Sequence, residues 1–279
     1  MSGRLYLVAT PIGNLEDITY RAVRTLREVH LIACEDTRQT RKLLDHYSIA
    51  TSLVSYHEHN EAERAAELAD KLEAGSSIAM VSDAGMPLVA DPGYRLVRAA
   101  IERGIAVEPI PGPSACLTAL AASGLPTDEF RFSGFPPPKA GKRGKWLETL
   151  RGETCTLVFY EAPHRILETL DDIERVLPGR PVVVARELTK LHEEFLRGSA
   201  REIHDVLAAR DSIRGEFTVL VGKAESAAPD ERPVEDAVEE LERVGIPRME
   251  AIKQVARARG LGKAEVYDAL IAARRKTLR

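Results

Sequence analysis

The sequence predicts an α/β protein of two α/β domains followed by a small helical tail. Three observations predict this class. Short apolar runs rich in β-branched residues alternate with amphipathic helical patterns through most of the chain. Clusters of turn-forming residues interrupt the alternation at 123–130 and again at 224–233. Beyond the second interruption, acidic and basic residues separate into two blocks.

The first domain is expected over residues 1–122, on a doubly wound parallel sheet. Its strand-like runs lie near 5–9, 30–34, 52–54, 77–81 and 105–110. Helical patterns, with apolar residues at i, i+3, i+4 and i+7, lie at 61–74, 93–103 and 113–122. Because strands that alternate with helices form βαβ units, these strands should run parallel.

The second domain is expected over residues 123–225. Its strand-like runs lie at 131–134, 155–160, 181–186, 194–197 and 216–222, with helical patterns at 164–177 and 199–209. Two of these strands are joined by short links, which suit antiparallel neighbours better than parallel ones. We therefore expect a mixed sheet here.

A helix-turn-helix-like tail is expected over residues 231–279. Three short helices are predicted, at 234–244, 247–259 and 263–276. Residues 230–244 hold seven acids and two bases, whereas residues 245–279 hold nine bases and three acids. The last helix ends in Arg274, Arg275 and Lys276, which favours a nucleic-acid module, although a solvated helical tail has the same pattern.

Composition excludes several classes of protein. Of the 279 residues, 44% are hydrophobic and 29% are charged, which is ordinary for a globular chain and unlike a disordered one. No apolar run reaches the roughly 20 residues of a membrane helix, and the N-terminus lacks a signal peptide's apolar core. We therefore expect a cytoplasmic protein without membrane contact. The three cysteines are far apart, so neither a disulfide framework nor a metal site is expected.

Four turns follow strands of the first domain, at the edge where open α/β sheets bind ligands. They span residues 9–14, 35–38, 82–87 and 109–115. In the third turn, Asp83 suits ribose hydroxyls or a plain turn. The fourth turn is either a rigid helix start or a ligand cradle at Ser114. In the second turn, Asp36 or Thr37 caps a helix, or the acids contact substrate.

Charged side chains also follow two strands of the second domain, at residues 160–165 and 186–190. His164 is a candidate base, although a histidine that opens a helix is more often structural. Residues 135–146 contain four bases and no acid, and their glycines and prolines predict an exposed loop. Such a loop could contact phosphates, with Phe135 or Trp146 stacking on a base, or it could simply be solvated.

Several common catalytic motifs are missing from the sequence. It contains no GxSxG elbow, no HExxH and no Walker A loop. Serine hydrolases, zinc proteases and P-loop enzymes are therefore disfavoured.

Six motifs, taken in this order, carry a resemblance to a known family. They are LYLVATPIGNLEDIT, CEDTR, SDAGMPLVADPG, IPGPSA, FYEAPHR and ARELTK. Together they resemble the tetrapyrrole-methylase superfamily, and within it the ribosomal small-subunit methyltransferase I family. The resemblance covers residues 1–223 strongly, and the tail is similar to that family's C-terminal helix-turn-helix.

The resemblance implies a fold, a cofactor, a substrate and an assembly. The fold would hold S-adenosylmethionine between two α/β domains. The reaction would methylate the ribose 2′-oxygen of cytidine 1402 in 16S rRNA of the 30S ribosomal subunit. The protein would be a homodimer. The residues carried over to the cofactor are Pro11, Ile12, Asp83, Met86, Ser114, Ala115 and, through the backbone around it, Glu161.

Methyl transfer to a ribose hydroxyl needs a group that accepts its proton. Glu35 and Asp36 are the preferred candidates, and Glu161, His164 and Glu187 are the alternatives. Lys190 is also placed at the reaction centre, where it would hold a phosphate or lower the pKa of the nucleophile. RNA phosphates are expected to meet basic or histidine side chains in the turns, the 135–146 segment and the tail. These are Arg38, Lys139, Lys142, Arg143, Lys145, His164, Arg165, Arg274 and Arg275.

Two other functions compete with this reading. A tetrapyrrole or other small-molecule methyltransferase would keep the fold, but it would need neither the basic segment nor the tail. A DNA-binding regulator with a ligand-sensing body would use the helix-turn-helix. The net charge of −4 and the single short basic helix weigh against that regulator.

Overall fold

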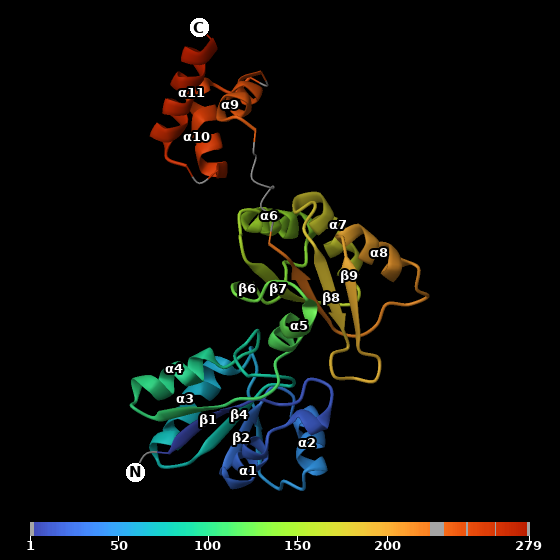
Figure 1. The fold of residues 1–279 in the computed structure, drawn as a ribbon. Coiled ribbons are helices and arrows are strands. Elements are labelled where there is room, and N and C mark those ends of the chain that lie inside the picture. Colours follow the sequence, from blue (N-terminus) through green and yellow to red (C-terminus); the bar gives the residue numbers. More distant parts are fainter. Residues whose placement is uncertain (1–2, 224–231, 244, 260, 278–279) are drawn as a thin grey trace. The chain divides into compact units, whose positions relative to one another are not determined.

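The computed structural model describes residues 3–223, 232–243, 245–259 and 261–277 (Figure 1). The chain forms two compact units, Met1–Ala224 and Glu225–Arg279. The first unit contains two five-stranded sheets, and the second is helical. The boundary between residues 122 and 123, inside the first unit, stays a prediction.

The first sheet is entirely parallel, as predicted. Its strands stand in the order β3-β2-β4-β1-β5. They are β1 (Arg4–Val8), β2 (Leu31–Cys34), β3 (Leu53–Ser55), β4 (Ile78–Val81) and β5 (Ala106–Ile110). Leu5 pairs with Ile78 on one side and Val107 on the other, so the first strand of the chain lies inside the sheet.

Helices cover both faces of this sheet. α1 (Tyr20–Glu28) and α2 (Thr37–His46) bury Leu26 and Leu44 against one face. α3 (Glu61–Glu73) and α4 (Tyr94–Glu102) bury Leu68 and Leu96 against the other. A short 3₁₀ helix, η1 (Leu15–Asp17), precedes α1. The sheet is therefore doubly wound, and α1 is an element that the sequence patterns had not identified.

The second sheet is mixed, as predicted. Its order is β6-β7-β10-β8-β9, and only the β6–β7 pair is parallel. The strands are β6 (Phe130–Phe132), β7 (Thr156–Glu161), β8 (Val182–Arg186), β9 (Glu194–Gly198) and β10 (Phe217–Val221). β10, the last strand of the unit, lies at the centre of the sheet.

Alternate residues of the second sheet face two helical layers. Phe159 and Val184 face α6 (Ala140–Leu150), α7 (Ile166–Val176) and α8 (Ala200–Ala208). Val158 and Ala185 face α5 (Ala115–Ser123), whose Leu120 belongs to the same apolar cluster. The exposed loop expected over 135–146 is therefore wrong from Ala140 onward, because apolar side chains such as Leu147 anchor α6 on the sheet.

The second unit consists of the three predicted helices, α9 (Val234–Arg243), α10 (Arg248–Arg259) and α11 (Lys263–Thr277). They enclose a core of their own that includes Val238, Ile252 and Val266. Residues 224–231, most of the predicted linker, lie outside the described residues. None of the described helices is long and apolar enough to cross a membrane.

Candidate active site

The turns after β1 and β4 are joined at the carboxyl edge of the first sheet. The Gly85 carbonyl accepts from the Thr10 amide at 2.9 Å, and the Gly85 amide donates to the Thr10 carbonyl at 3.0 Å. The Thr10 hydroxyl donates to the Ser82 carbonyl at 3.1 Å. Gly85 adopts a φ of 84°, a left-handed conformation that favours glycine. The two turns therefore form one rigid support.

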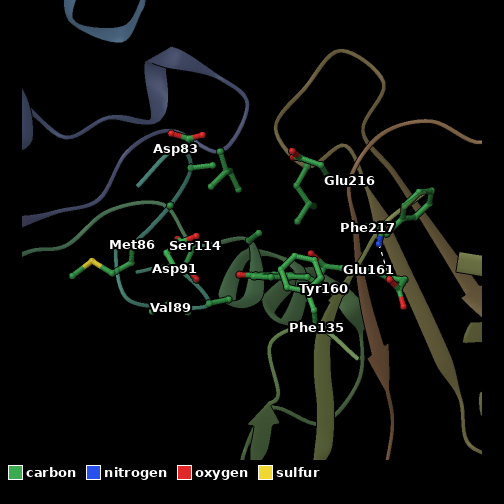
Figure 2. A pocket seen from close by; sticks show the side chains of 18 of the residues that line it. Asp83, Met86, Val89, Asp91, Ser114, Phe135, Tyr160, Glu161, Glu216 and Phe217 are labelled. Atoms are coloured by element: carbon green, nitrogen blue, oxygen red, sulfur yellow. Dashed lines mark hydrogen bonds between the residues drawn. The ribbon is translucent and has the colours of Figure 1, made fainter. Parts of the chain in front are cut away.

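A cavity of about 360 Å³ opens between this support and the strand ends of the second sheet. On the side of the first sheet, the lining residues are 12, 83–86, 89–91 and 114–115. On the side of the second sheet, the lining residues are 135, 160–163, 188 and 216–218. Its volume lies within the range of small-molecule sites. Figure 2 shows Asp83, Asp91 and Ser114 on one side, and Phe135, Tyr160 and Glu216 on the other.

Six of the seven residues predicted to hold the cofactor line this cavity. They are Ile12, Asp83, Met86, Ser114, Ala115 and Glu161. Pro11 belongs to the same turn as Ile12 but is not a lining residue. Ser114 caps α5, because its hydroxyl accepts from the Leu117 amide at 3.5 Å. The structure thus brings together, from the ends of four separate strands, residues that the resemblance had assigned to the cofactor.

Two carboxyl groups on the first-sheet side resist ionisation. Burial, followed by the charges of Glu35 and Asp83, raises the pKa of Asp91 to about 6, against a smaller opposing effect of a Ser82 hydrogen bond. Burial and the charge of Asp83 also raise the pKa of Glu35. Glu35 follows β2 and lies near Asp83 without lining the cavity. Both residues are half-buried, and a carboxyl group with a raised pKa beside a cavity is typical of a functional site.

The carboxylate of Asp36 stabilises the start of α2. It accepts from the Arg38 amide at 2.8 Å, which caps α2, and it forms an ion pair with the Arg38 guanidinium at 3.0 Å. Hydrogen bonds from Arg38 lower the pKa of Asp36. The Asp36 amide donates to Asp83 Oδ1 at 3.1 Å and thereby ties the start of α2 to the edge of the cavity.

Glu161 is completely buried, and its carboxylate is fully engaged. It accepts from the Ala162 amide at 2.8 Å and from the Thr169 hydroxyl at 2.7 Å, and it pairs with Arg165 Nη2 at 2.6 Å. These contacts hold the turn that leaves β7. What Glu161 offers a ligand is the backbone around it, and the Arg165 guanidinium is committed to this ion pair.

Glu187 and Lys190 lie beside the cavity. Lys190 Nζ donates to Glu187 Oε1 at 2.9 Å and to Glu216 Oε2 at 3.1 Å. Burial opposes ionisation of Glu187, but the Lys190 hydrogen bond, the Glu216 amide and the positive charges of Lys190 and Arg186 together outweigh it and lower the pKa of Glu187. A Cβ on Gly13 would lie 2.5 Å from Lys190 Cγ, so this loop packs tightly on the turn after β1. Their part in catalysis stays a prediction.

The residues predicted to contact RNA differ in their availability. Lys139, Lys142, Lys145, His164 and Arg38 are exposed. Arg143 is a correction, because its side chain is only 1% exposed and pairs with Asp172 at 2.7 Å and Glu168 at 3.1 Å, which join α6 to α7. Trp146 likewise packs against Phe159 in the core. Arg274 and Arg275 belong to α11, but their side chains lie outside the described part of the chain.

Asp91 and Tyr160 shape the cavity but were not among the predicted site residues, and Phe135, expected to stack on an RNA base, also lines it. Asp91 lies eight residues beyond Asp83, and the chain returns to the cavity through left-handed residues at Leu88 and Ala90. Phe135 and Tyr160 form an aromatic pair with ring centroids 5.6 Å apart. The acidic ADPG turn was the available signal for Asp91. Among the described residues, no three His, Cys, Asp or Glu side chains gather as a metal site.

Comparison with known proteins identifies the family. Residues 4–204 match the model of the Tetrapyrrole (Corrin/Porphyrin) Methylases. The chain belongs to the tetrapyrrole methylase family. Over 95% of its length, this tetrapyrrole methylase is 53% identical to the ribosomal RNA small subunit methyltransferase I of Halalkalibacterium halodurans, of which the match covers 94%. The Bacillus subtilis protein of that name is 46% identical, over 96% of this chain and 94% of its own.

Solved structures share the fold of this tetrapyrrole methylase. Uroporphyrin-III-C-methyltransferase from Thermus thermophilus superposes with a TM-score of 0.56 at 22% identity, over 79% of this chain and 94% of its own. The methyltransferase CobJ gives a TM-score of 0.60 at 22% identity, over 80% and 95% of the two chains. A further structure of the Thermus enzyme, in complex with S-adenyl homocysteine, gives a TM-score of 0.54 at 21% identity, over 78% and 97%.

Proposed function

We propose that this tetrapyrrole methylase transfers a methyl group from S-adenosylmethionine to the small-subunit ribosomal RNA. The acceptor is the ribose 2′-oxygen of cytidine 1402 in 16S rRNA. Relatives of 46–53% identity that match along nearly their whole length are named for small-subunit rRNA methylation. The structural observation that carries the proposal is the cavity of about 360 Å³ between the two sheets.

The cavity residues fit a nucleoside that carries a sulfonium side chain. The apolar side chains of Met86, Val89 and Ile12 line the cavity and can pack against an adenine ring and an aliphatic chain. Asp83 and Asp91 supply negative charge near the edge, which suits ribose hydroxyls and a cationic group. The Glu161–Pro163 turn, held by its buried ion pair, supplies backbone groups. When bound, S-adenosylmethionine supplies an electrophilic methyl group.

The protein's own part in the reaction is positioning and proton acceptance. The joined turns after β1 and β4 hold Asp83 and Ile12 in place, so the acceptor oxygen can be oriented without moving the backbone. Such orientation can contribute several kcal/mol, on the order of 7–11 at most. Phe135 and Tyr160 cover the second-sheet side and limit the access of water. Burial raises the pKa of Tyr160 to about 12, so its phenol stays protonated.

Within the Glu35–Asp36 pair, we propose that Glu35 accepts the ribose proton. Glu35 immediately precedes Asp36, whose amide donates to the cavity residue Asp83 at 3.1 Å, so it lies at the edge of the cavity. Burial also raises the pKa of Glu35, which improves its carboxylate as a base. The carboxylate of Asp36 is occupied by its own helix and by Arg38. The exposed Lys139, Lys142 and Lys145 on and beside α6 are proposed to contact RNA phosphates, together with Arg38.

A homodimer is also part of the proposal. Exposed apolar side chains on α4 and α5, which follow one another in the sequence, favour a surface that a second copy covers. Tyr94 and Ile101, on one side of α4, are 66% and 62% exposed, and Leu117 of α5 is 55% exposed.

The test is methyl transfer from labelled S-adenosylmethionine to 30S subunits that lack the modification, followed by nucleoside analysis. The expected product is 2′-O-methylcytidine at one position. Naked 16S rRNA and a uroporphyrinogen serve as alternative acceptors in parallel reactions. Transfer to the uroporphyrinogen alone would replace the RNA acceptor with a tetrapyrrole, and transfer to another nucleotide would correct the target.

A further inference from the structure

The two faces of the first sheet differ in their charge. α1 and α2, on one face, contain six Lys or Arg residues and two acidic residues. α3 and α4, on the other face, contain four Lys or Arg residues and six acidic residues. The whole chain has a net charge of −4, so the excess of positive charge on α1 and α2 has the opposite sign.

The cations of α1 and α2 are largely unmatched. We call them the α1–α2 surface, which consists of Arg21, Arg24, Arg27, Arg38, Arg41 and Lys42. All are exposed except the half-buried Arg41. Within the described part of the chain, Arg38 alone of the six has an ion pair, with Asp36. Neutral oxygen atoms accept from three others, at Pro109, Tyr47 and Gln39.

The cations of the opposite face are matched. Arg64 and Lys71 both pair with Glu67, and Arg98 pairs with Glu102 at 2.7 Å. Arg95 pairs with Glu61 at 3.7 Å. Arg103, at the end of α4, pairs with Asp70 and Glu73. A polyanion that approached this face would have to displace a protein carboxylate from each cation.

The α1–α2 surface begins at the cavity. The amide of Asp36, the residue that caps α2, donates to Asp83, which lines the cavity. At the far end of α2, the Tyr47 carbonyl accepts from Arg27 at 2.7 Å, which joins α2 to α1. Leu26 and Leu44 of the two helices share one apolar cluster. The positive surface thus extends from the cavity edge along α2 to α1.

We propose that the α1–α2 surface binds the phosphodiester backbone of the RNA whose target nucleotide enters the cavity. This docking rests on the proposed function. Guanidinium groups match phosphate oxygens in paired hydrogen bonds. Arg21, Arg24 and Arg27 follow one another at intervals of three, so they lie along one side of α1. Since no carboxylate of the described residues pairs with these three arginines, phosphate binding releases counterions without displacing a protein carboxylate.

The experiment compares two double variants of the full-length protein. Arg24→Gln with Arg41→Gln removes two cations from the α1–α2 surface. Lys71→Gln with Arg98→Gln removes two from the opposite face and changes the net charge equally. Affinity for unmodified 30S subunits is measured between 50 and 200 mM KCl. The first variant should lose about tenfold in affinity, and its log–log salt slope should become less steep by about 1.5.

The control variant should stay within about twofold of the wild type in affinity, and its salt slope should be unchanged. S-adenosylmethionine affinity and Tm should be unchanged in both variants, which shows that both are folded. Equal losses in the two variants would overturn the docking surface in favour of overall charge. Full affinity of the Arg24–Arg41 variant, with normal methyl transfer by the wild type, would overturn the docking surface and leave the function standing. A wild type that transfers no methyl to 30S subunits would instead overturn the proposed function.

Discussion

The two sides of the cavity hold their carboxylates in opposite ways. On the second-sheet side, Glu161 accepts three donors, and a lysine lowers the pKa of the neighbouring Glu187 despite its burial. On the first-sheet side, burial and neighbouring negative charges raise the pKa values of Asp91 and Glu35. Glu161 and Glu187 both form ion pairs with cationic side chains. Among the described residues, neither Asp91 nor Glu35 has an ion pair.

This difference distinguishes carboxylates that stabilise the fold from carboxyl groups that are available to a ligand. A buried carboxylate with a full set of donors holds its turn in place and has no capacity left for a ligand. Ionisation of a half-buried carboxyl group that has no cationic partner lowers the stability of the fold. Such groups are typical of sites that bind a ligand or transfer a proton. We therefore assign support to the Glu161 side and ligand chemistry to the Asp91 side.

Among the substitutions that test this comparison, Glu161→Ala should have the largest effect on stability. The substitution would strand the Arg165 guanidinium, whose Nε already has no partner among the described residues. Loss of one member of a buried ion pair costs about 3–5 kcal/mol. We expect a loss of that size in the free energy of unfolding by urea at pH 7. Glu148→Ala, on the exposed side of α6, should change it by less than about 0.5 kcal/mol. A loss below about 1 kcal/mol for Glu161→Ala would contradict the supporting role.

An intermediate effect is expected for Asp91→Asn. The folded pKa of about 6 lies above the ordinary 3.8, so ionisation of Asp91 destabilises the fold progressively as pH rises from about 4 to 6. The full shift corresponds to about 3 kcal/mol, but solvent screening reduces it because Asp91 is only half-buried. The variant should therefore be more stable than the wild type by about 2 kcal/mol at pH 8, and this gain should disappear near pH 4. Urea unfolding across pH measures it, with the exposed Asp128→Asn as control. A gain that is the same at both pH values would show that ionisation is not its cause.

The smallest effect is expected for Lys190→Met, which keeps the aliphatic packing on Gly13 but removes the charge. The pKa of Glu187 is lowered in the fold, so its ionised form stabilises the protein above about pH 4.5, and this contribution is lost as pH falls. We expect a loss below about 1 kcal/mol at pH 7, reduced by salt. Lys145→Met, at an exposed position, should show no such pH dependence. A loss that persists at pH 3 would assign the effect to packing.

Most strands and the cavity turns could be predicted from the sequence because both depend on local patterns. Apolar β-branched runs such as IAMV form strands, and in a parallel sheet the turns that follow them meet at one edge. Asp83, Ser114 and Glu161 lie at such ends, so their convergence followed from topology. The polar helix α1 was missed because its apolar residues are few and its arginines resemble a surface segment.

Long-range packing accounts for what could not be predicted. Arg143 resembles its exposed lysine neighbours in sequence, yet α7 supplies Asp172 and Glu168 to bury it. Nothing local to Asp91 reveals that Glu35, far away in the chain, lies close enough to raise its pKa. The contacts of Glu161 likewise depend on Arg165 and Thr169, which lie four and eight residues further along the chain.

The strand order has a consequence for how the protein is made. β1, the first strand to leave the ribosome, needs Ile78 of β4 and Ala106 of β5 before it has a neighbour on either side. β10, the last strand of the unit, fills the gap between β7 and β8. Neither sheet can close until distant parts of the chain have been synthesised, and pairings of such wide sequence separation fold slowly. The unit should therefore acquire its cavity late and in one cooperative step, after Val221 has emerged.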